Sequence, residues 1–532
     1  MDGASSSPFF LGFDLSTQSL KAVLISEDSS VAHESAVHFD RDLPHHGTTN
    51  GAIRGPGIGE VTSPVHMWLE AFDLILERMK AAGVDFGRIL AISGDGQQHG
   101  SVYWSLDAEK MLTTLDPSKP LDQLAPGAFS LPNAPIWQDS STTRECRELE
   151  AAVGGAQALA DLTGSRAYER FTGTQIAKIR RVSPEAYNAT SRVSLVSSFM
   201  PSVFLGAIAP IEMHAEAPNC EPKLGPNRYR EEACLAGSAL TGLSDGVSIQ
   251  ACVDVDDLCD NPATVVALST PGDAILSLGT STTFLLSIPP ADTPPKRFTT
   301  SHLLSHPTTL DAQIAMLCYK NGALAREQVR DRYANGDWTR FNELVEQTVV
   351  GNDGYLGFYF PLPEIIPPNV HGNFLFHVTP SATDVASVLE DTMPAAAHPR
   401  AILESQFLSI RARITAILPP DAPPLQRLVV CGGSSANPVI RQLAADVFGM
   451  RVFIAGQQGA AEGGAQLARY AWWRTQNGGV GTFEEMRATD PMGGRMKCVA
   501  EPRDANVAVY AGLIDAYQKC EDRVVMLCEA FA

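Results

Sequence analysis

The stretch FFLGFDLSTQSLKAVLI, residues 9–25, decides the fold. Its first part, 9–15, is apolar enough for a buried strand, and 21–25 form a second strand. The residues between them, Ser16-Thr17-Gln18-Ser19, form a hairpin turn with small hydroxyl side chains at its tip. Such a turn can direct backbone N–H groups toward a phosphate. Asp14, just before the turn, is a candidate Mg²⁺ ligand, held directly or through water.

A similar unit recurs far along the chain. Residues 274–278, AILSL, lead into Gly279-Thr280-Ser281-Thr282, and 283–288, TFLLSI, run back out. Either unit alone is better explained as an ordinary hairpin. Their repetition predicts an internal duplication that brings two hydroxyl turns to one ligand.

Further segments alternate between strand and helix patterns, which predicts layered α/β domains. The strand patterns are 88–94, 101–104, 427–431 and 451–454, and the helix patterns are 64–82 and 438–449. Asn437 and Pro438 suit the N-cap and first position of the second helix. We expect surface loops at 40–60 and 107–135.

Polar residues in the loops suit a sugar or a nucleotide, each with an ordinary alternative. Gln97-Gln98-His99 could bind sugar hydroxyls, although a loop histidine is more often simply solvated. Arg170 is either a ligand-binding cation or half of a structural ion pair. Asp260, before Asn261-Pro262, is typical of a helix N-cap, but a carboxylate near a γ-phosphate could accept a proton from an attacking hydroxyl. The turn 432–437 suits close approach of a nucleotide, and a tight β–α turn explains its glycines nearly as well.

The totals restrict the class of protein. A chain of 532 residues with 44% hydrophobic and 19% charged residues predicts two large globular domains. Its net charge of −20 repels a nucleic-acid backbone, so we expect no nucleic-acid partner. We expect no membrane segment and no signal peptide. The ten cysteines lack C-x-x-C pairs, which favours free thiols in the cytoplasm. The oligomeric state stays open.

Together the motifs resemble the FGGY carbohydrate kinases, and among them the eukaryotic-type xylulokinases. The resemblance covers nearly the whole chain, and the runs are highly specific in combination. The matching runs are LGFDLSTQSLKAVL (11–24), GQQHGSVYW (96–104), PIWQDSSTT (135–143), LTGSRAYERFTGTQIAKI (162–179), GDAILSLGTSTT (272–283), CYKNGALAREQVR (318–330), GNDGYLGFYF (351–360) and GGSSANPVIRQLAADVFG (432–449).

The resemblance implies an α/β fold of two actin-like (ribonuclease H-like) domains that face each other across a catalytic cleft. Residues 1–270 would form the sugar side and 271–532 the nucleotide side. The implied reaction transfers the γ-phosphate of ATP, with Mg²⁺, to the terminal hydroxyl of D-xylulose, giving D-xylulose 5-phosphate and ADP. The implied partners are these small molecules.

The resemblance also implies a role for each matching position. Asp260 would be the general base, with His99, Arg170 and Asn261 as further sugar contacts. Asp14 would hold the metal. The implied phosphate contacts are Ser16, Thr17, Gly279 and Thr280, and the implied nucleoside contacts are Trp338, Gly433, Ser434 and Asn437.

The chain departs from the family pattern between 212 and 259. After Pro210 the family continues with an Asp/Ser/Gly-Met-Asn segment and a Trp, which this chain lacks, and Cys259 stands where the family has glycine. We expect this segment to pack poorly and Cys259 to strain its loop, which would make a weak enzyme or a catalytically impaired binding homologue. An FGGY kinase for ribulose, gluconate or glycerol, and an actin- or chaperone-like ATPase, are also compatible with the motifs. The loop at Gln98-His99 and the run at 168–173 favour xylulose.

Overall fold

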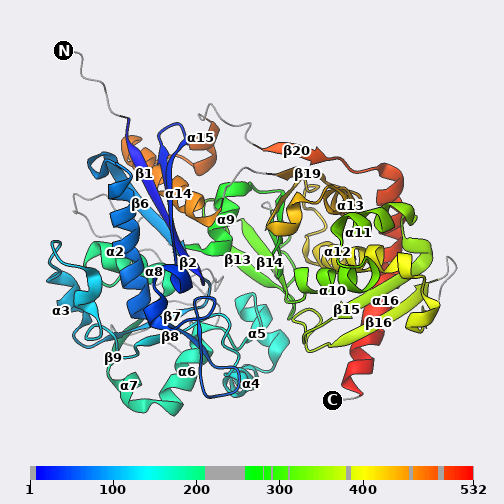
Figure 1. Cartoon of the computed structure of the whole chain (residues 1–532), viewed down its shortest axis with the longest axis horizontal. Helices are drawn as coiled ribbons and strands as arrows, with labels where there is room; N and C mark the ends of the chain where they lie inside the picture. The colour runs from blue at the N-terminus through cyan, green and yellow to red at the C-terminus, as the bar shows by residue number, and fades with distance from the viewer. Residues whose placement is uncertain are drawn as a thin grey trace. The chain divides into compact units, whose positions relative to one another are not determined.

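The computed structural model describes residues 7–209, 258–279, 281–288, 291–309, 312–378, 385–454, 459–488 and 496–530. The chain divides into two compact units (Figure 1). Unit 1 contains 1–268, 304–311 and 458–493, and unit 2 contains 269–303, 312–457 and 494–532.

The main sheet of unit 1 has the strand order β10-β6-β1-β2-β3. These strands are β1 (Phe9–Leu15), β2 (Ser19–Ser26), β3 (Val31–His38), β6 (Ile89–Gly96) and β10 (Leu258–Cys259). The expected hairpin is the antiparallel pair β1–β2, and β6 runs parallel to both β1 and β10. Every residue of β1 after Phe9 is buried, because helices cover both faces of the sheet.

Smaller elements complete unit 1. Two minor sheets contain β4 (Ile53–Arg54), β5 (Val61–Pro64) and β8 (Asn133–Pro135), and β7 (Ser101–Ser105) and β9 (Thr190–Leu195). The helices are α1 (Phe39–Asp42), α2 (Val65–Ala81), α3 (Ala108–Thr113), α4 (Thr143–Ala152), α5 (Ala156–Thr163), α6 (Thr172–Val182), α7 (Pro184–Asn188), α8 (Val196–Leu205), α9 (Asp260–Leu268), α14 (Ala460–Gln476) and α15 (Phe483–Ala488). Short 3₁₀ turns are η1 (Pro44–His46), η2 (Phe86–Arg88) and η3 (Leu121–Leu124). The expected surface loops 40–60 and 107–135 therefore contain short helices and strands.

The main sheet of unit 2 has the order β13-β14-β12-β11-β18-β19-β20. Its strands are β11 (Asp273–Leu278), β12 (Thr282–Ile288), β13 (His302–Ser305), β14 (Gln313–Tyr319), β18 (Arg427–Cys431), β19 (Arg451–Ile454) and β20 (Lys497–Ala500). A hairpin, β11–β12, again has a parallel strand, β18, beside its first member. Apart from the edge strands β13 and β20, the second sheet runs β14-β12-β11-β18-β19, which is the same arrangement as β3-β2-β1-β6-β10 in unit 1. This correspondence confirms the expected duplicated α/β fold.

Around this second sheet lie helices and one three-stranded sheet. The sheet is β15 (Tyr355–Phe360), β16 (Gly372–Val378) and β17 (Val385–Ser387). The helices are α10 (Ala323–Tyr333), α11 (Trp338–Gln347), α12 (His398–Ile417), α13 (Pro438–Phe448) and α16 (Asp504–Glu529). A 3₁₀ turn, η8 (Gly433–Ala436), precedes α13. Buried residues of α12 run through the centre of the hydrophobic core of unit 2.

Residues 458–493 belong to unit 1, whereas the sequence pattern placed all of 271–532 in the second domain. The reason is the packing of α14, which contacts β1 and β6. Ala465 and Ala468 are buried against Phe10 and Ala91, and the rings of Trp472 and Phe10 lie 5.3 Å apart. Two domains separated at one point in the chain therefore do not describe this fold, because the chain returns to unit 1 at α14.

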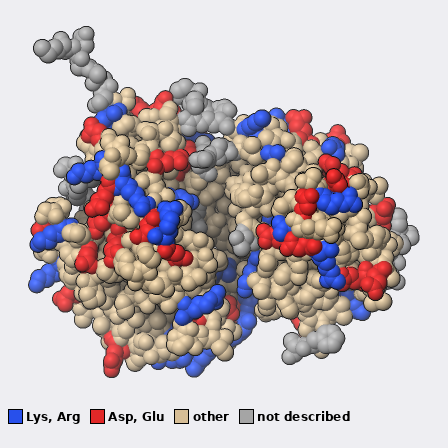
Figure 2. Space-filling view, in the orientation of Figure 1, with Lys and Arg blue, Asp and Glu red and all other residues tan. Residues whose placement is uncertain are grey.

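Charge is mixed over the visible surface. Figure 2 shows acidic and basic side chains interspersed on the face drawn there. No helix in the described part of the chain is both long enough and apolar enough to cross a membrane.

Candidate active site

Three parallel strands of unit 1 end at one edge of the sheet. Asp14 lies opposite Asp95 on the neighbouring strand, and Cys259 lies opposite Gly96. Asp260 follows at once as the first residue of α9. The hydroxyl turn after β1, the loop after β6 and the start of α9 therefore share the carboxyl edge, where open α/β sheets bind ligands.

Asp14 is a buried carboxylate at this edge, with 4% of its surface exposed. One carboxylate oxygen accepts a hydrogen bond from Ser16 Oγ, and the other lies 3.7 Å from Lys21 Nζ. Asp95 is fully buried on the adjacent strand. Neighbouring carboxylates are the oxygen ligands that Mg²⁺ prefers, so the residues present fit a magnesium ion.

The turn after β1 is held from the side. Thr17 Oγ1 accepts a hydrogen bond of 2.8 Å from Trp137 Nε1. Trp137 lies in the run PIWQDSSTT, to which the sequence pattern assigned no role. This contact fixes the rotamer of a hydroxyl that is expected to face phosphate.

The loop after β6 is joined to the start of α9. Asn261 Nδ2 donates a hydrogen bond of 3.0 Å to Gln98 Oε1. The next residue, His99, has a φ of +64°, an uncommon backbone conformation for a residue with a side chain. Its carbonyl accepts a hydrogen bond of 3.0 Å from Thr172 Oγ1. A non-glycine residue in this region persists where its surroundings hold it, which is common at binding sites.

Arg170 lies in the same group. Its guanidinium is 4.5 Å from the ring centre of Tyr168 and 5.7 Å from that of Phe171. The His99 ring lies 4.7 Å from the second of these rings, Phe171. The structure thus brings His99, Arg170 and Asn261 together, with Asp260 next in the chain to Asn261.

The described residues that are expected on the nucleotide side lie in unit 2, after β11, after β18 and at the start of α11. Gly432 has a φ of +84°, and a Cβ there would lie 2.8 Å from the carbonyl carbon of Leu278. Glycine is required here because the turn before α13 lies against the end of β11, just before Gly279. Thr280 lies outside the described residues. At Gly433, by contrast, no atom lies within 4 Å of a Cβ position.

Asn437 caps α13, as the sequence predicted. Its Oδ1 accepts a hydrogen bond of 2.9 Å from the Val439 backbone N–H. Its Nδ2 donates to Asn342 Oδ1 at 2.7 Å, which ties the turn to α11. Trp338 begins α11, and the Arg330 guanidinium lies 4.9 Å above its ring. The hydrogen bond between Asn437 and Asn342 therefore connects the turn before α13 to α11, the two elements that are expected to bind the nucleoside.

Arg326 is a residue that sequence reasoning missed. It is fully buried on α10 and donates from Nη1 to Gln406 Oε1 at 2.8 Å. Its Nη2 donates to Ser434 Oγ at 3.2 Å. Among the described residues no carboxylate lies within ion-pair distance of it, and burial lowers its pKa to about 10. Its only sequence signal is its place in the run CYKNGALAREQVR.

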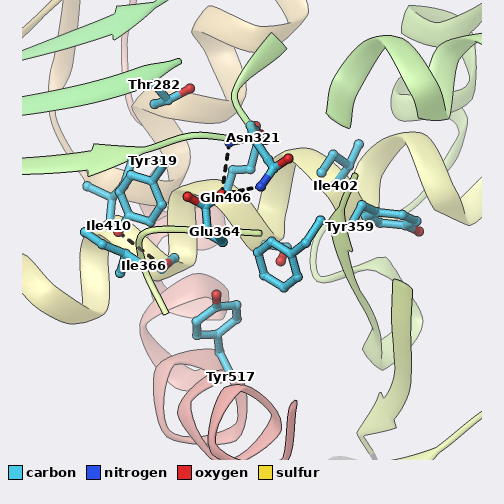
Figure 3. A pocket seen from close by; sticks show the side chains of 13 residues that line it. Thr282, Tyr319, Asn321, Tyr359, Glu364, Ile366, Ile402, Gln406, Ile410 and Tyr517 are labelled. Carbon is cyan, nitrogen blue, oxygen red and sulfur yellow. Dashed lines mark hydrogen bonds between the residues drawn. The ribbon is translucent and has the colours of Figure 1, made fainter. Parts of the chain in front are cut away.

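A small cavity lies in unit 2 beside these groups (Figure 3). Its volume is about 30 Å³, which leaves room for water but is far too small for a nucleotide. Glu364 accepts hydrogen bonds of 3.0 and 2.9 Å from the backbone and side chain of Asn321, whose carbonyl accepts from Gln406 Nε2 at 2.8 Å. Gln406 in turn accepts a hydrogen bond from Arg326, so this network fixes the position of the Arg326 guanidinium.

Two expectations concern the divergent segment. Residues 210–257, which hold nearly all of it, lie outside the described residues. Cys259 lies in β10, where the backbone is extended, a conformation that any residue adopts. The extended backbone therefore removes a left-handed conformation as a source of strain at Cys259, and the other source, close packing of its side chain against a bound phosphate, stays a prediction.

Comparisons with known proteins agree over the length of the chain. Residues 274–472 match the model of the FGGY family of carbohydrate kinases, C-terminal domain. The chain is 38% identical over 544 residues to the xylulose kinase of Mus musculus, covering 97% of this chain and 94% of that protein. It is 39% identical over 539 residues to xylulose kinase 2 of Arabidopsis thaliana, covering 95% of each.

Solved structures show the same fold at much lower identity. Xylulose kinase from Rhodospirillum rubrum has a TM-score of 0.70 at 16% identity, covering 98% of this chain and 100% of that one. Gluconate kinase from Lactobacillus acidophilus has a TM-score of 0.68 at 13% identity, covering 99% and 100%. The fold alone therefore does not distinguish between sugars.

Proposed function

Because this chain belongs to the FGGY family of carbohydrate kinases, we propose that it transfers the γ-phosphate of MgATP to the terminal hydroxyl of D-xylulose, giving D-xylulose 5-phosphate and ADP. The observation that carries the choice of sugar is the identity of 38% and 39% with two proteins named xylulose kinases, over at least 95% of this chain. We also propose that the enzyme is cytoplasmic, in keeping with free thiols among the described residues at Cys146, Cys431, Cys498, Cys520 and Cys528.

The sugar binds at the carboxyl edge of the unit 1 sheet in this proposal. His99, Arg170 and Asn261 bind its hydroxyls, and the hydrogen bond between Asn261 and Gln98 holds the two segments that carry them. Asp260 accepts the proton from the attacking hydroxyl. A sugar hydroxyl is a poor nucleophile, so a positioned carboxylate base speeds the transfer.

The metal and phosphates bind next to the sugar. Asp14 holds Mg²⁺, and buried Asp95 adds a second negative charge beside it. Mg²⁺ neutralises charge on the phosphates during transfer. The turn Ser16-Thr17, together with Gly279-Thr280, supplies backbone N–H and hydroxyl groups to the phosphates.

The nucleoside binds against the turn before α13. Trp338, Gly433, Ser434 and Asn437 contact it in this proposal. Arg326 does not reach the ligand, because it is fully buried, and acts through Ser434. Its positive charge, without a carboxylate partner among the described residues, favours an anionic ligand nearby.

A coupled assay of ADP release tests the proposal. The full chain is supplied with MgATP and, in parallel, with D-xylulose, D-ribulose, gluconate, glycerol or no sugar, and calorimetry measures the binding of each sugar. We expect kcat/KM to be highest for D-xylulose. Release that is no faster with xylulose than with another sugar makes the substrate assignment wrong. Binding of xylulose without turnover would identify an impaired homologue, and equal release without sugar would identify an ATPase.

A further inference from the structure

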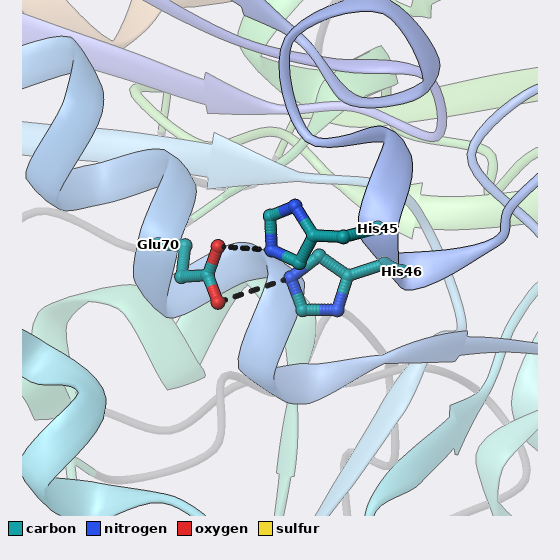
Figure 4. A group of neighbouring side chains, drawn as sticks. All are labelled: His45, His46 and Glu70. Atoms are coloured by element: carbon teal, nitrogen blue, oxygen red, sulfur yellow. Dashed lines mark hydrogen bonds and ion pairs between the residues drawn. The ribbon is translucent and has the colours of Figure 1, made fainter.

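Three histidines meet one glutamate in unit 1, outside the residues assigned to sugar and ATP. His45 and His46 lie on η1, and His66 and Glu70 lie one turn apart on α2. His45 Nε2 is 2.7 Å from Glu70 Oε2, and His46 Nε2 is 3.3 Å from Glu70 Oε1. Figure 4 shows both rings pointing toward the same carboxylate.

We propose that His45, His46 and Glu70 form a binding site for a divalent transition-metal ion such as Zn²⁺. Their nearest nitrogen and oxygen atoms all lie within 4.8 Å of one another. In a tetrahedral zinc site with bonds of about 2.0–2.1 Å, ligand atoms lie about 3.3 Å apart. The separation of 3.3 Å between His46 and Glu70 already has this value, and small side-chain rotations bring His45 to it.

The chemistry of the donors selects the class of metal. Two imidazole nitrogens and one carboxylate suit Zn²⁺ and its neighbours in the transition series. Mg²⁺ and Ca²⁺ prefer sites made of oxygen atoms, and this site offers only one carboxylate as a ligand. A fourth position remains for water, since the His45 side chain is 59% exposed.

The surroundings of His46 also suit a metal ligand. Its side chain is only 8% exposed, and its Nε2 is buried without a hydrogen bond of acceptable geometry. The contact of this buried nitrogen with Glu70 Oε1 lacks good hydrogen-bond geometry, which is costly, and a metal ion bound between the two atoms would satisfy both. Burial also lowers the pKa of His46, which favours the neutral imidazole that binds metals.

His66 holds the carboxylate from outside. Its Nε2 lies 3.2 Å from Glu70 Oε1 and 2.5 Å from Asp122 Oδ1. Groups that contact a ligating carboxylate fix its orientation and tune the affinity for the metal. We therefore assign His66 as a positioning residue and not as a ligand.

A metal here would fasten a loop that reaches the proposed phosphate turn. The loop after η1 is anchored by Asp40, which accepts hydrogen bonds from Thr48 Oγ1 at 2.7 Å and the Gly51 N–H at 3.0 Å. Gly51, with a φ of +73°, lies so close to Thr17 that a Cβ would come within 1.8 Å of the Thr17 carbonyl oxygen. Binding would thus join α2 to the segment that packs on Thr17, and we expect it to stabilise unit 1.

Calorimetric titration of the EDTA-treated, dialysed full chain with ZnCl₂ tests the site. We expect one zinc per chain, lost in the double variant His45→Ala/His46→Ala and bound at least tenfold more weakly by Glu70→Gln. His66→Ala should lose roughly 10–100-fold in affinity, as outer partners of metal ligands do. The matched control is His38→Ala, an exposed histidine on the preceding strand, which should bind like the wild type.

Thermal unfolding gives a second readout. Zinc should raise the Tm of the wild type and of His38→Ala by several degrees and leave that of the double variant unchanged. Any effect of Mg²⁺ on the Tm should be the same in all three proteins, because the proposed Mg²⁺ site at Asp14 is intact in each. Zinc binding retained by the double variant would overturn the proposal. If that variant does not fold, His45→Gln replaces it, because the exposed His45 side chain tolerates substitution. Unchanged zinc affinity in His45→Gln would equally overturn the site.

Discussion

Two adjacent glycines before α13 form a matched pair for testing the nucleotide site. A Cβ at Gly433 meets no atom within 4 Å, so the fold itself does not oppose a side chain there. A Cβ at Gly432 would lie 2.8 Å from the Leu278 carbonyl carbon, on a backbone with a φ of +84°. A substitution at Gly433 can therefore affect ligand binding without affecting folding, whereas one at Gly432 affects folding itself.

The expected magnitudes differ accordingly. Gly433→Val should change the free energy of unfolding by no more than about 0.5 kcal/mol, as exposed substitutions do. Gly432→Ala should cost on the order of 1–3 kcal/mol, because it places a side chain on a left-handed backbone against main-chain atoms. If ATP lies against Gly433, a branched side chain should raise the KM for ATP about tenfold or more, equivalent to about 1.4 kcal/mol or more.

Initial rates with each substrate varied at a saturating level of the other, together with Tm measurements, check both expectations. The KM for xylulose should stay within about twofold of the wild type in Gly433→Val, because the substitution changes no residue that is proposed to bind the sugar. A larger rise in the KM for xylulose than for ATP would place the sugar at this turn and refute the assignment. If the Tm of Gly433→Val were as low as that of Gly432→Ala, the conclusion that there is space for a side chain at Gly433 would be wrong.

Four further changes test other contacts. Asp260→Asn should lower turnover by roughly 10²–10⁴-fold while calorimetry shows both substrates still bound; near-normal turnover would leave Asp260 as a helix cap. Arg326→Met should raise the KM for ATP more than Arg326→Lys, which keeps the charge, and equal values in steady-state kinetics would remove its electrostatic role. Arg400→Leu leaves the fully buried Glu404 without its cation, at a cost of about 3–5 kcal/mol. Burial raises the pKa of Glu404, and loss of the Arg400 cation should raise it further. Because a raised pKa in the folded state costs stability as the pH rises above the ordinary value, the Tm of Arg400→Leu should fall from pH 5 to pH 8 more than that of the wild type. Cys259→Gly should leave turnover within about twofold, since an extended backbone needs no glycine; a large gain would show that the side chain obstructs the site.

The elements that could be predicted from the sequence are those whose cause is local. The hairpin 9–25 is read from an apolar run, a polar turn and a second apolar run, and the structure forms it as β1–β2. Asn437 predicts the start of α13 because capping depends only on the next three residues. The return of α14 to β1 could not be predicted in this way, because its partner strand lies at the other end of the chain.

The same distinction between local and distant causes applies to the residues of the candidate site. Asn261 and His99 were proposed from their motifs, but the hydrogen bond that joins Asn261 to Gln98 depends on the pairing of distant strands. Apart from its place in the run CYKNGALAREQVR, nothing in the sequence marks Arg326, since an arginine on a helix with a polar pattern is expected to be exposed. Only the tertiary packing buries it next to Ser434. The functional importance of such a residue lies in its surroundings and not in its type.

The position of Asp260 follows from the strand pairing and not from the divergent segment before it. Leu258 and Cys259 pair with Asp95 and Gly96 on the central parallel strand, so the backbone of α9 begins one residue beyond the sheet edge. The same strand pairs Asp95 with Asp14, so the two ladders of β6 together determine where Asp14, Asp95 and Asp260 lie along the strand direction. A change in residues 212–257 that leaves this pairing intact should therefore not move the start of α9. We expect Asp260 to stay at the sheet edge for as long as β10 pairs with β6.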